Sequence, residues 1–266
     1  MKEKSKLNEN EKPKIAFFDL TGCNGCLYSI LNHPALLSID ESIEVLKFRL
    51  ASDVDRDLSC DVAIVEGYAA VQEEVKMLEK IRENADKVVA FGSCSSFGSI
   101  HSIQNFMNVK KAIEDIYPDN PVAIETPQKA VSIDKHISVD LKIPGCPPNA
   151  DEAVELIIDL VFGKMEPELA KWPVCVDCKM RENVCVFIHG APCLGPITRG
   201  GCGAPCPASY TCDGCRGPIE EPNIASEIEY LKKYAKEEEI IRLFKRYASS
   251  SPDFEKVIKG EINSRD

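Results

Sequence analysis

The sequence lacks the features of a membrane-spanning protein and of a nucleic-acid-binding protein. No apolar run approaches the ~20 residues that a helix needs to cross a bilayer. The N-terminal residues are charged and include no apolar segment of a secretory signal, and no twin-arginine pair precedes the first predicted strand. Basic residues number 32 against 43 acidic ones, and this net charge of −11 does not suit nucleic acid or an anionic membrane. We therefore expect a cytoplasmic protein with no membrane span and no nucleic-acid partner.

Cysteine, in contrast, is abundant. The 266 residues include 13 cysteines, and eight of these fall between Cys175 and Cys215. Thiols are kept reduced in the cytoplasm, so clustered cysteines there indicate metal ligands or redox centres before disulfides. An odd number of cysteines also cannot pair completely in disulfides. The sequence therefore favours metal or cluster binding over a disulfide scaffold.

Residues 13–165 alternate short apolar runs with helical patterns. Strands are predicted at 14–20, 44–50, 62–67, 87–94 and 141–146, and helices at 27–37, 71–84 and 149–162. Strands that alternate with helices are typical of an α/β domain with a mostly parallel sheet. We therefore predict an α/β fold for this part of the chain.

The composition changes after this domain. Residues 166–220 are rich in cysteine, glycine and proline and show no sustained helix or strand period. Such a segment cannot bury a core of its own, so we expect cofactors to hold it together. Residues 227–247 have the pattern of a charged amphipathic helix, within a C-terminal tail at 221–266. The predicted organisation is thus 13–165, 166–220 and 221–266.

Four cysteines of the first domain follow predicted strands. Cys23 and Cys26 come after the first strand, while Cys94 and Cys146 stand on glycine turns after later strands. Ligands of open α/β sheets bind at the carboxyl ends of the strands, so these four can converge on one site. Four thiolates can hold a 4Fe–4S cluster or a zinc ion, although one C-x2-C with two distant single cysteines fits a zinc ribbon poorly. Taken singly, Cys94 or Cys146 could also be a small buried side chain.

The later cysteines form two further sets of four. In chain order they are Cys175-x2-Cys178-x6-Cys185-x7-Cys193 and Cys202-x3-Cys206-x5-Cys212-x2-Cys215. Each set supplies the four ligands of an iron–sulfur cluster, and two zinc sites are the alternative. Ferredoxins exchange their last ligand between clusters, so Cys193, Cys206 and Cys215 could be exchanged here. Cys60 is left over, and we interpret it as a core residue.

Six stretches of the sequence, five of which contain these cysteines, are motifs of a known family. They are TGCNGC at 21–26, VEG at 65–67, GSCSSFGS at 92–99, GCPP at 145–148, CLGPITRGGCG at 193–203 and CDGCRGP at 212–218. With them the chain resembles the small, electron-transferring subunit of cytoplasmic nickel–iron hydrogenases over about residues 13–250. It is most similar to the sulfhydrogenase delta subunit and to the gamma subunits of methanogen hydrogenases.

The resemblance implies a flavodoxin-like domain, an irregular iron–sulfur segment, a terminal helix and three 4Fe–4S clusters. The implied ligands are, for the proximal cluster, Cys23, Cys26, Cys94 and Cys146; for the distal cluster, Cys175, Cys178, Cys185 and Cys193; and for the medial cluster, Cys202, Cys206, Cys212 and Cys215. Relatives outside the cytoplasm use a histidine in place of the first distal ligand. His189 is expected at the surface or beside the cluster. Glu66 is expected beside the proximal cluster or in a proton path.

The resemblance also implies partners. The nickel–iron site would belong to a separate large subunit, because this chain lacks the paired C-x2-C motifs that ligate nickel. The chain would then be an oxidoreductase subunit that acts on hydrogen only within a complex. Electrons would pass to or from a further flavin- and iron–sulfur-bearing subunit, with NAD(P), the deazaflavin coenzyme or a heterodisulfide reductase module as acceptor.

Two other functions compete with this interpretation. One is an energy-coupling subunit related to complex I or to membrane-bound hydrogenases. Those relatives usually keep only the proximal site, and the eight additional cysteines argue against this reading. The other is a zinc-stabilised interaction protein without a redox role, which would be colourless, whereas three 4Fe–4S clusters would make a brown protein.

Overall fold

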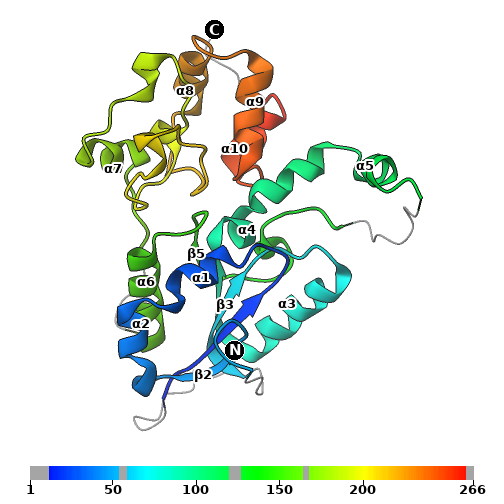
Figure 1. The fold of residues 1–266 in the computed structure, drawn as a ribbon, viewed down its shortest axis with the longest axis vertical. Helices are drawn as coiled ribbons and strands as arrows, with labels where there is room; N and C mark the ends of the chain where they lie inside the picture. The colour runs from blue at the N-terminus through cyan, green and yellow to red at the C-terminus, as the bar shows by residue number, and fades with distance from the viewer. Residues whose placement is uncertain (1–11, 54–58, 120–126, 164–167, 262–266) are drawn as a thin grey trace.

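A five-stranded parallel sheet forms the first half of the protein (Figure 1). The computed structural model describes residues 12–53, 59–119, 127–163 and 168–261. The strands are β1 (Lys14–Asp19), β2 (Glu44–Phe48), β3 (Cys60–Glu66), β4 (Ala85–Phe91) and β5 (Leu141–Ile143). Their order in the sheet is β2-β1-β3-β4-β5, and all four pairings are parallel. This is the flavodoxin-like order of doubly wound folds, so the predicted α/β class is confirmed.

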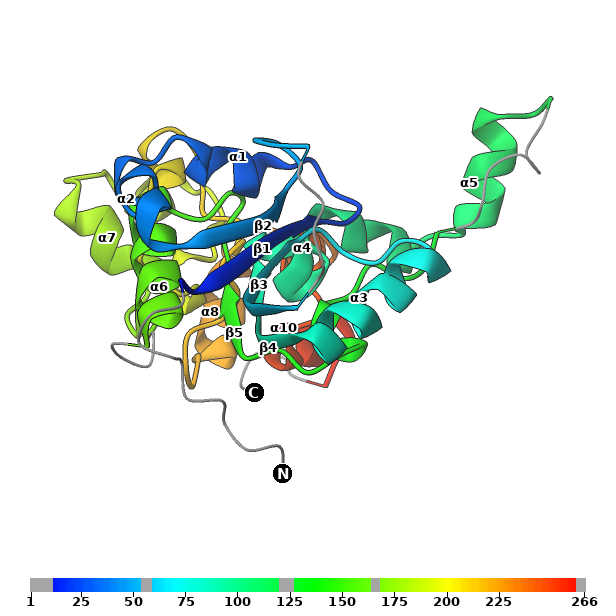
Figure 2. The same cartoon turned by 90° about the horizontal axis from the view of Figure 1, so that it is seen from below.

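Helices cover both faces of this sheet (Figure 2). On one face α1 (Gly25–Leu31) and α2 (Pro34–Ser38) contact α6 (Ala150–Phe162), and on the other lies α3 (Gln72–Asn84). Neighbouring side chains of a strand point to opposite faces, so Phe17 joins the first apolar core and Phe18 the second. The central strands are buried on both sides, which explains their continuous apolar sequences.

The long helices begin and end where their capping residues dictate. The Asn149 side chain accepts a hydrogen bond from the Glu152 N–H at 3.0 Å and caps α6, which ends at Gly163 with φ 61°. The Glu74 carboxylate accepts from the Ala70 N–H at 2.7 Å and so fixes the first turn of α3. Both helices lie within two residues of their predicted limits.

Two predicted elements around the cysteine turns are shorter in the structure. The helix predicted at 27–37 is two helices, with the short turn η1 (Asp40–Ser42) after them. The strand predicted at 87–94 ends at Phe91, and α4 (Gly92–Phe97) begins there. After it come η2 (Ser99–Phe106) and α5 (Val109–Ile116), which extends away from the sheet in both views, and then η4 (Ile133–Lys135) (Figures 1 and 2).

The cysteine-rich segment is more helical than predicted. It contains α7 (Val174–Met180) and three short turns, η5 (Val186–His189), η6 (Gly195–Ile197) and η7 (Cys206–Ala208). The single amphipathic helix predicted at 227–247 is wrong. Two helices, α8 (Ile224–Leu231) and α9 (Glu237–Arg246), occupy this range, and α10 (Pro252–Ile258) follows. The break lets all three helices pack on Leu194 and Ile197 in one apolar cluster.

No helix in the described ranges is both long and apolar enough to pass through a bilayer.

Candidate functional site

Four cysteines meet at the carboxyl edge of the sheet. Cys23 and Cys26 follow β1, Cys94 lies in α4 directly after β4, and Cys146 follows β5. Burial raises the pKa of Cys94 to about 12, and the charges of Cys146 and Cys23 add to the shift. Burial also raises the pKa of Cys26, to which Cys94 and Cys146 contribute in the same direction. The four thiols are therefore close enough to oppose one another's ionisation.

Small side chains make room for these thiols. Gly92 has φ 87°, and a side chain on it would collide with the Cys26 sulfur. The hydroxyl of Ser99 faces Cys94 and Cys146 and lowers the pKa of both, against the larger effect of burial on each. Glycine at position 92 is thus required both by the left-handed backbone and by the close approach of a sulfur atom.

Glu66 lies beneath this group at the end of β3. Its side chain is 1% exposed, and its carboxylate accepts hydrogen bonds from the backbone N–H groups of Cys26 at 3.1 Å and Leu27 at 2.7 Å. Burial raises the pKa of Glu66, and the two backbone hydrogen bonds oppose that shift. The carboxylate thus fixes the first turn of α1, from which Cys26 projects.

The second group of four cysteines surrounds a cavity beside α7. Its lining includes Cys175, Cys178, Cys185 and Cys193. The Cys193 sulfur accepts hydrogen bonds from the backbone N–H groups of Gly195 at 3.4 Å and Cys212 at 3.3 Å. His189, nearby in sequence, is exposed.

A buried acid accompanies this second group. Glu227 on α8 is 5% exposed, and its Oε1 has no hydrogen-bond partner among the described residues. Burial raises the pKa of Glu227 to about 8. The charge of Glu227 contributes, after burial, to the raised pKa of Cys175. Sequence reasoning missed this residue, because one glutamate in a charged helix gives no sign of being buried.

The third group surrounds another cavity, between the sheet and the second group. Its lining includes Cys202, Cys206, Cys212 and Cys215, together with Cys146. Burial raises the pKa of Cys215 to about 12, and a hydrogen bond from the Cys146 N–H opposes this shift. Backbone N–H groups thus connect the groups in series, from Cys146 to Cys215 and from Cys212 to Cys193.

Buried polar residues join the third group to the sheet. Arg216, 1% exposed, forms an ion pair with Glu152 of α6, and its Nη1 donates to the Pro144 carbonyl at 3.0 Å. The Ser93 hydroxyl donates to the Cys215 carbonyl and accepts from the Gly145 N–H at 3.2 Å. Sequence analysis included Arg216 in a motif but gave it no role, and it missed Glu152 and Ser93. No local pattern links residues 64 and 122 positions apart.

Cys60 is separate from all three groups. It lies at the opposite, amino end of β3, is 5% exposed and belongs to an apolar core. Burial raises its pKa to about 11, and the charges that modify it belong to Asp61, Asp86 and Arg82 rather than to other cysteines. Its interpretation as a core residue is confirmed.

The donor set determines what these groups can hold. All 13 cysteines are unpaired. Crowded thiols with raised pKa values ionise together only when a positively charged centre binds them. In the described ranges, no three His, Cys, Asp or Glu side chains converge on a single metal ion. Sulfur atoms and backbone N–H donors around a cavity fit a multinuclear iron–sulfur group, whose sulfurs accept such hydrogen bonds.

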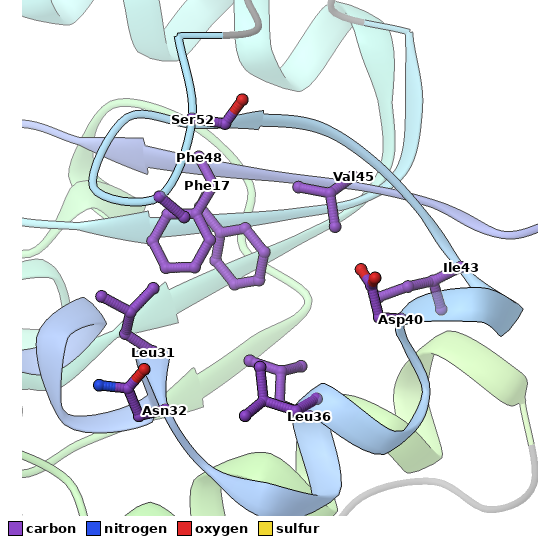
Figure 3. Close-up of a pocket in the computed structure, with 11 residues that line it drawn as sticks. Phe17, Leu31, Asn32, Leu36, Asp40, Ile43, Val45, Phe48 and Ser52 are labelled. Carbon is purple, nitrogen blue, oxygen red and sulfur yellow. The ribbon is translucent and has the colours of Figure 1, made fainter.

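A further cavity of about 500 Å³ lies between β2 and the α1–α2 turn (Figure 3). The stacked rings of Phe17 and Phe48, with centroids 4.2 Å apart, form one wall, and Leu31 and Leu36 form another. No cysteine lines it, so it is separate from the cysteine groups.

Comparison with known proteins identifies relatives of this chain. Residues 23–160 match the family described as NADH ubiquinone oxidoreductase, 20 kDa subunit. The sulfhydrogenase 2 subunit delta of Pyrococcus furiosus is 34% identical over 240 residues, covering 88% of this chain and 99% of the relative. A subunit of the F420-non-reducing hydrogenase vhu of Methanococcus voltae is 29% identical, covering 73% of this chain and 77% of the relative.

A solved structure gives the same indication. A chain in the crystal structure of an NAD+-reducing [NiFe]-hydrogenase in the H2-reduced state superposes with a TM-score of 0.54 at 27% identity. The match covers 59% of this chain and 95% of that chain. The family match ends at residue 160, before the cysteine-rich segment, whereas the Pyrococcus subunit matches 88% of the chain and so extends into it.

Proposed function

This chain belongs to the family of the NADH ubiquinone oxidoreductase 20 kDa subunit and is a subunit of the nickel–iron hydrogenase type, and from that premise we propose that it relays electrons through three 4Fe–4S clusters. A bound 4Fe–4S cluster accepts and releases one electron at a time. The function of the chain is then to hold the clusters, shield them from water and set their potentials.

The proposed ligands are the three groups of cysteines. The proximal site uses Cys23, Cys26, Cys94 and Cys146, the distal site uses Cys175, Cys178, Cys185 and Cys193, and the medial site uses Cys202, Cys206, Cys212 and Cys215. For the last two sites, each set of four lines its own cavity, and this supports the partition in chain order. The lining of the medial cavity by Cys146 supports a proximal–medial–distal series.

The observation that carries this proposal is the linkage between successive groups. Cys146 lines the cavity of the third group and its N–H lowers the pKa of Cys215, and the Cys212 N–H donates to the sulfur of Cys193 at 3.3 Å. Each donor belongs to a proposed ligand of one site and each acceptor to a proposed ligand of the next. Such contacts bring neighbouring redox centres close together, as an electron relay requires.

The protein residues around the proximal site have separate tasks in this proposal. Glu66 orients Cys26 through the two backbone hydrogen bonds and is not itself a ligand. The Ser99 hydroxyl lowers the pKa of Cys94 and of Cys146, so it stabilises negative charge on their sulfurs. Cys23 and Cys146 are the exposed members of the group, and we propose that a hydrogenase large subunit with the nickel–iron site covers this side.

The distal end would meet the second partner. We propose a further flavin- and iron–sulfur-bearing subunit there, with NAD(P), the deazaflavin coenzyme or a heterodisulfide reductase module as final acceptor. The names of the relatives support more than one acceptor, since F420-non-reducing and NAD+-reducing hydrogenases both occur among them. The proposed organisation is a relay domain at 13–165, a two-cluster segment at 166–220 and a helical tail at 221–266. The unpaired cysteines support a reducing, cytoplasmic compartment.

Metal analysis of the native complex tests the proposal. The chain is purified anaerobically with the proteins that accompany it, and iron, zinc and nickel are measured for each separated subunit. We expect about twelve irons in this chain, four for each cluster, with nickel only in a larger partner. Iron near four would contradict the roles of the eight later cysteines, and zinc without iron would overturn the redox function.

A further inference from the structure

The buried ion pair at the junction has a feature that a structural role does not require. The Arg216 side chain is fully buried; Nη2 donates to Glu152 Oε1 at 2.8 Å, and Nη1 lies 2.7 Å from Oε2. With the hydrogen bond to Pro144, the two Nη groups are engaged. The Nε–H, in contrast, has no hydrogen-bond partner among the described residues. A buried donor without a partner is costly, and Arg216 lines the third cavity, so a group bound there can accept this hydrogen bond.

Arg216 also acts on the cysteines of this cavity. It lines the cavity with Cys202, Cys206, Cys212 and Cys215. The guanidinium therefore stabilises negative charge where the sulfur ligands gather. A group that stabilises thiolate also stabilises the more negative, reduced form of a redox centre bound there.

Buried acids accompany the other two groups, Glu66 at the first and Glu227 at the second. A buried acid also lies beside the third group, because Asp177 accepts hydrogen bonds from the backbone N–H groups of Gly201 at 2.7 Å and Gly203 at 3.1 Å. The cation lining the second cavity is Lys179, which is exposed and therefore screened by water. Among the described residues that line the second and third cavities, Arg216 alone is a buried cation.

The chain leaves space for this ion pair. Gly201 has φ 91°; a side chain there would collide with Glu152 Oε1 and would come within 3.0 Å of Arg216 Nη2. Cys202 follows Gly201 directly, so the backbone that presents one proposed ligand also accommodates the pair. The same short stretch of backbone therefore contacts the ion pair and carries a cysteine of the third group.

We propose that Arg216 tunes the redox centre held by Cys202, Cys206, Cys212 and Cys215, donating its free Nε–H to a sulfur of that centre and raising its reduction potential. Glu152 holds the guanidinium in place and partly offsets its charge. The inference rests on the proposed function, because it needs an iron–sulfur cluster in this cavity. The ion pair of Arg216 with Glu152 would thus set the reduction potential of the middle cluster of the relay.

The two halves of the pair allow a sharp test. Arg216→Met removes the positive charge, and Glu152→Gln removes the negative charge while keeping a hydrogen-bonding side chain. Both variants weaken the same contact, so a purely structural role predicts the same change from both. The electrostatic role predicts opposite shifts, with the midpoint potential lower in Arg216→Met and higher in Glu152→Gln.

The measurement is a redox titration of the anaerobically purified complex, followed by electron paramagnetic resonance. The signal of the middle site is identified as the one altered by Cys206→Ser. We expect Arg216→Met to change the one-electron reduction equilibrium at least tenfold, which corresponds to about 59 mV. The control is Arg246→Met, because Arg246 pairs with the cavity residue Asp213 but is 41% exposed. Water screens its charge, so its shift should be less than a third as large.

Iron content separates failure of this inference from failure of the proposed function. If the unmodified chain lacks iron, the proposed function fails. If Glu152→Gln keeps full iron and its potential stays unchanged or falls, the tuning role of Arg216 is overturned while the relay stands. Glu152→Gln alone decides this point if Arg216→Met fails to fold. Arg216→Lys tests the Nε–H separately, because it keeps the positive charge and removes this donor. We expect it to lower the potential by less than Arg216→Met, and an unchanged potential would overturn the Nε–H contact.

Discussion

The sheet domain and the cysteine-rich segment differ in what holds them together. The sheet has an apolar core on each face, with residues such as Phe17, Phe18, Ile64 and Val65 fully buried. In the cysteine-rich segment, Leu194 and Ile197 pack on the C-terminal helices. The described cluster that lies within the segment has five buried members, and three of them are Cys178, Cys193 and Cys212. The hydrophobic effect can therefore account for the first region, whereas the second depends on groups that its cysteines bind.

Removing the iron should produce the largest difference between the two regions. In the full chain treated anaerobically with a chelator, we expect residues 168–220 to lose order while the sheet keeps it. Hydrogen exchange should rise at least tenfold in peptides from 168–220 and less than twofold in peptides from β1, β3 and β4. Trp172, the sole tryptophan, lies in this segment, so loss of its fluorescence anisotropy reports the same event. Equal protection before and after chelation would remove the distinction between the regions.

Serine substitution at two buried cysteines of the sheet domain should distinguish a cluster ligand from a residue of the apolar core. Cys94→Ser is expected to lose about four of twelve irons and hydrogen-dependent dye reduction, while most iron of the later cysteines stays bound. Cys60→Ser should keep all iron and activity and should cost about 1–3 kcal/mol of stability, because it buries a hydroxyl. Metal analysis and chemical denaturation measure the two effects. Unchanged dye reduction in Cys94→Ser would disprove the proximal assignment.

Two glycines with left-handed backbones offer a finer comparison. Gly92 at φ 87° faces the Cys26 sulfur, whereas Gly163 at φ 61° has no atom within 4 Å of an added side chain. Alanine at either position should cost about 1–2 kcal/mol through backbone strain. Gly92→Ala alone should also lower the iron content, because its side chain collides with the sulfur. Equal iron loss in both variants would show that strain, not the collision, disturbs the site.

The last comparison concerns pH and the helix beside the second group. The pKa of Glu227 is raised to about 8 by burial, above the ordinary range near 4.3. Between these values the folded chain binds more protons than the unfolded chain, so its stability should fall as pH rises from about 4 to 8, by at most 1.36 kcal/mol per pH unit. Glu227→Gln should flatten this slope, measured by chemical denaturation. The exposed Glu229→Gln on the same helix should leave it unchanged.

The sequence predicted those features that depend on local pattern. The apolar run at Val62–Glu66 and the glycine turn before Cys94 predicted a parallel sheet with cysteines at its carboxyl edge. The helix break after Leu231 was missed, although Glu239 caps the second helix by accepting a hydrogen bond from the Lys236 N–H at 2.9 Å. Packing of all three helices on Leu194 and Ile197 accompanies the break and has no local sequence pattern. The pair of Arg216 with Glu152 was missed because it depends on tertiary contact alone.

The contacts across the junction also bear on how the protein is made. Ser93 and Cys215 are 122 positions apart, and Arg216 and Glu152 are 64 apart. During folding, contacts between such distant positions form late, after local structure has formed. All four proposed proximal ligands lie within residues 23–146, so they leave the ribosome before Cys202 is synthesised. Domains fold as units during synthesis, N-terminal first. The sheet domain is therefore expected to fold first, and the later segment is expected to pack on it afterwards through these contacts.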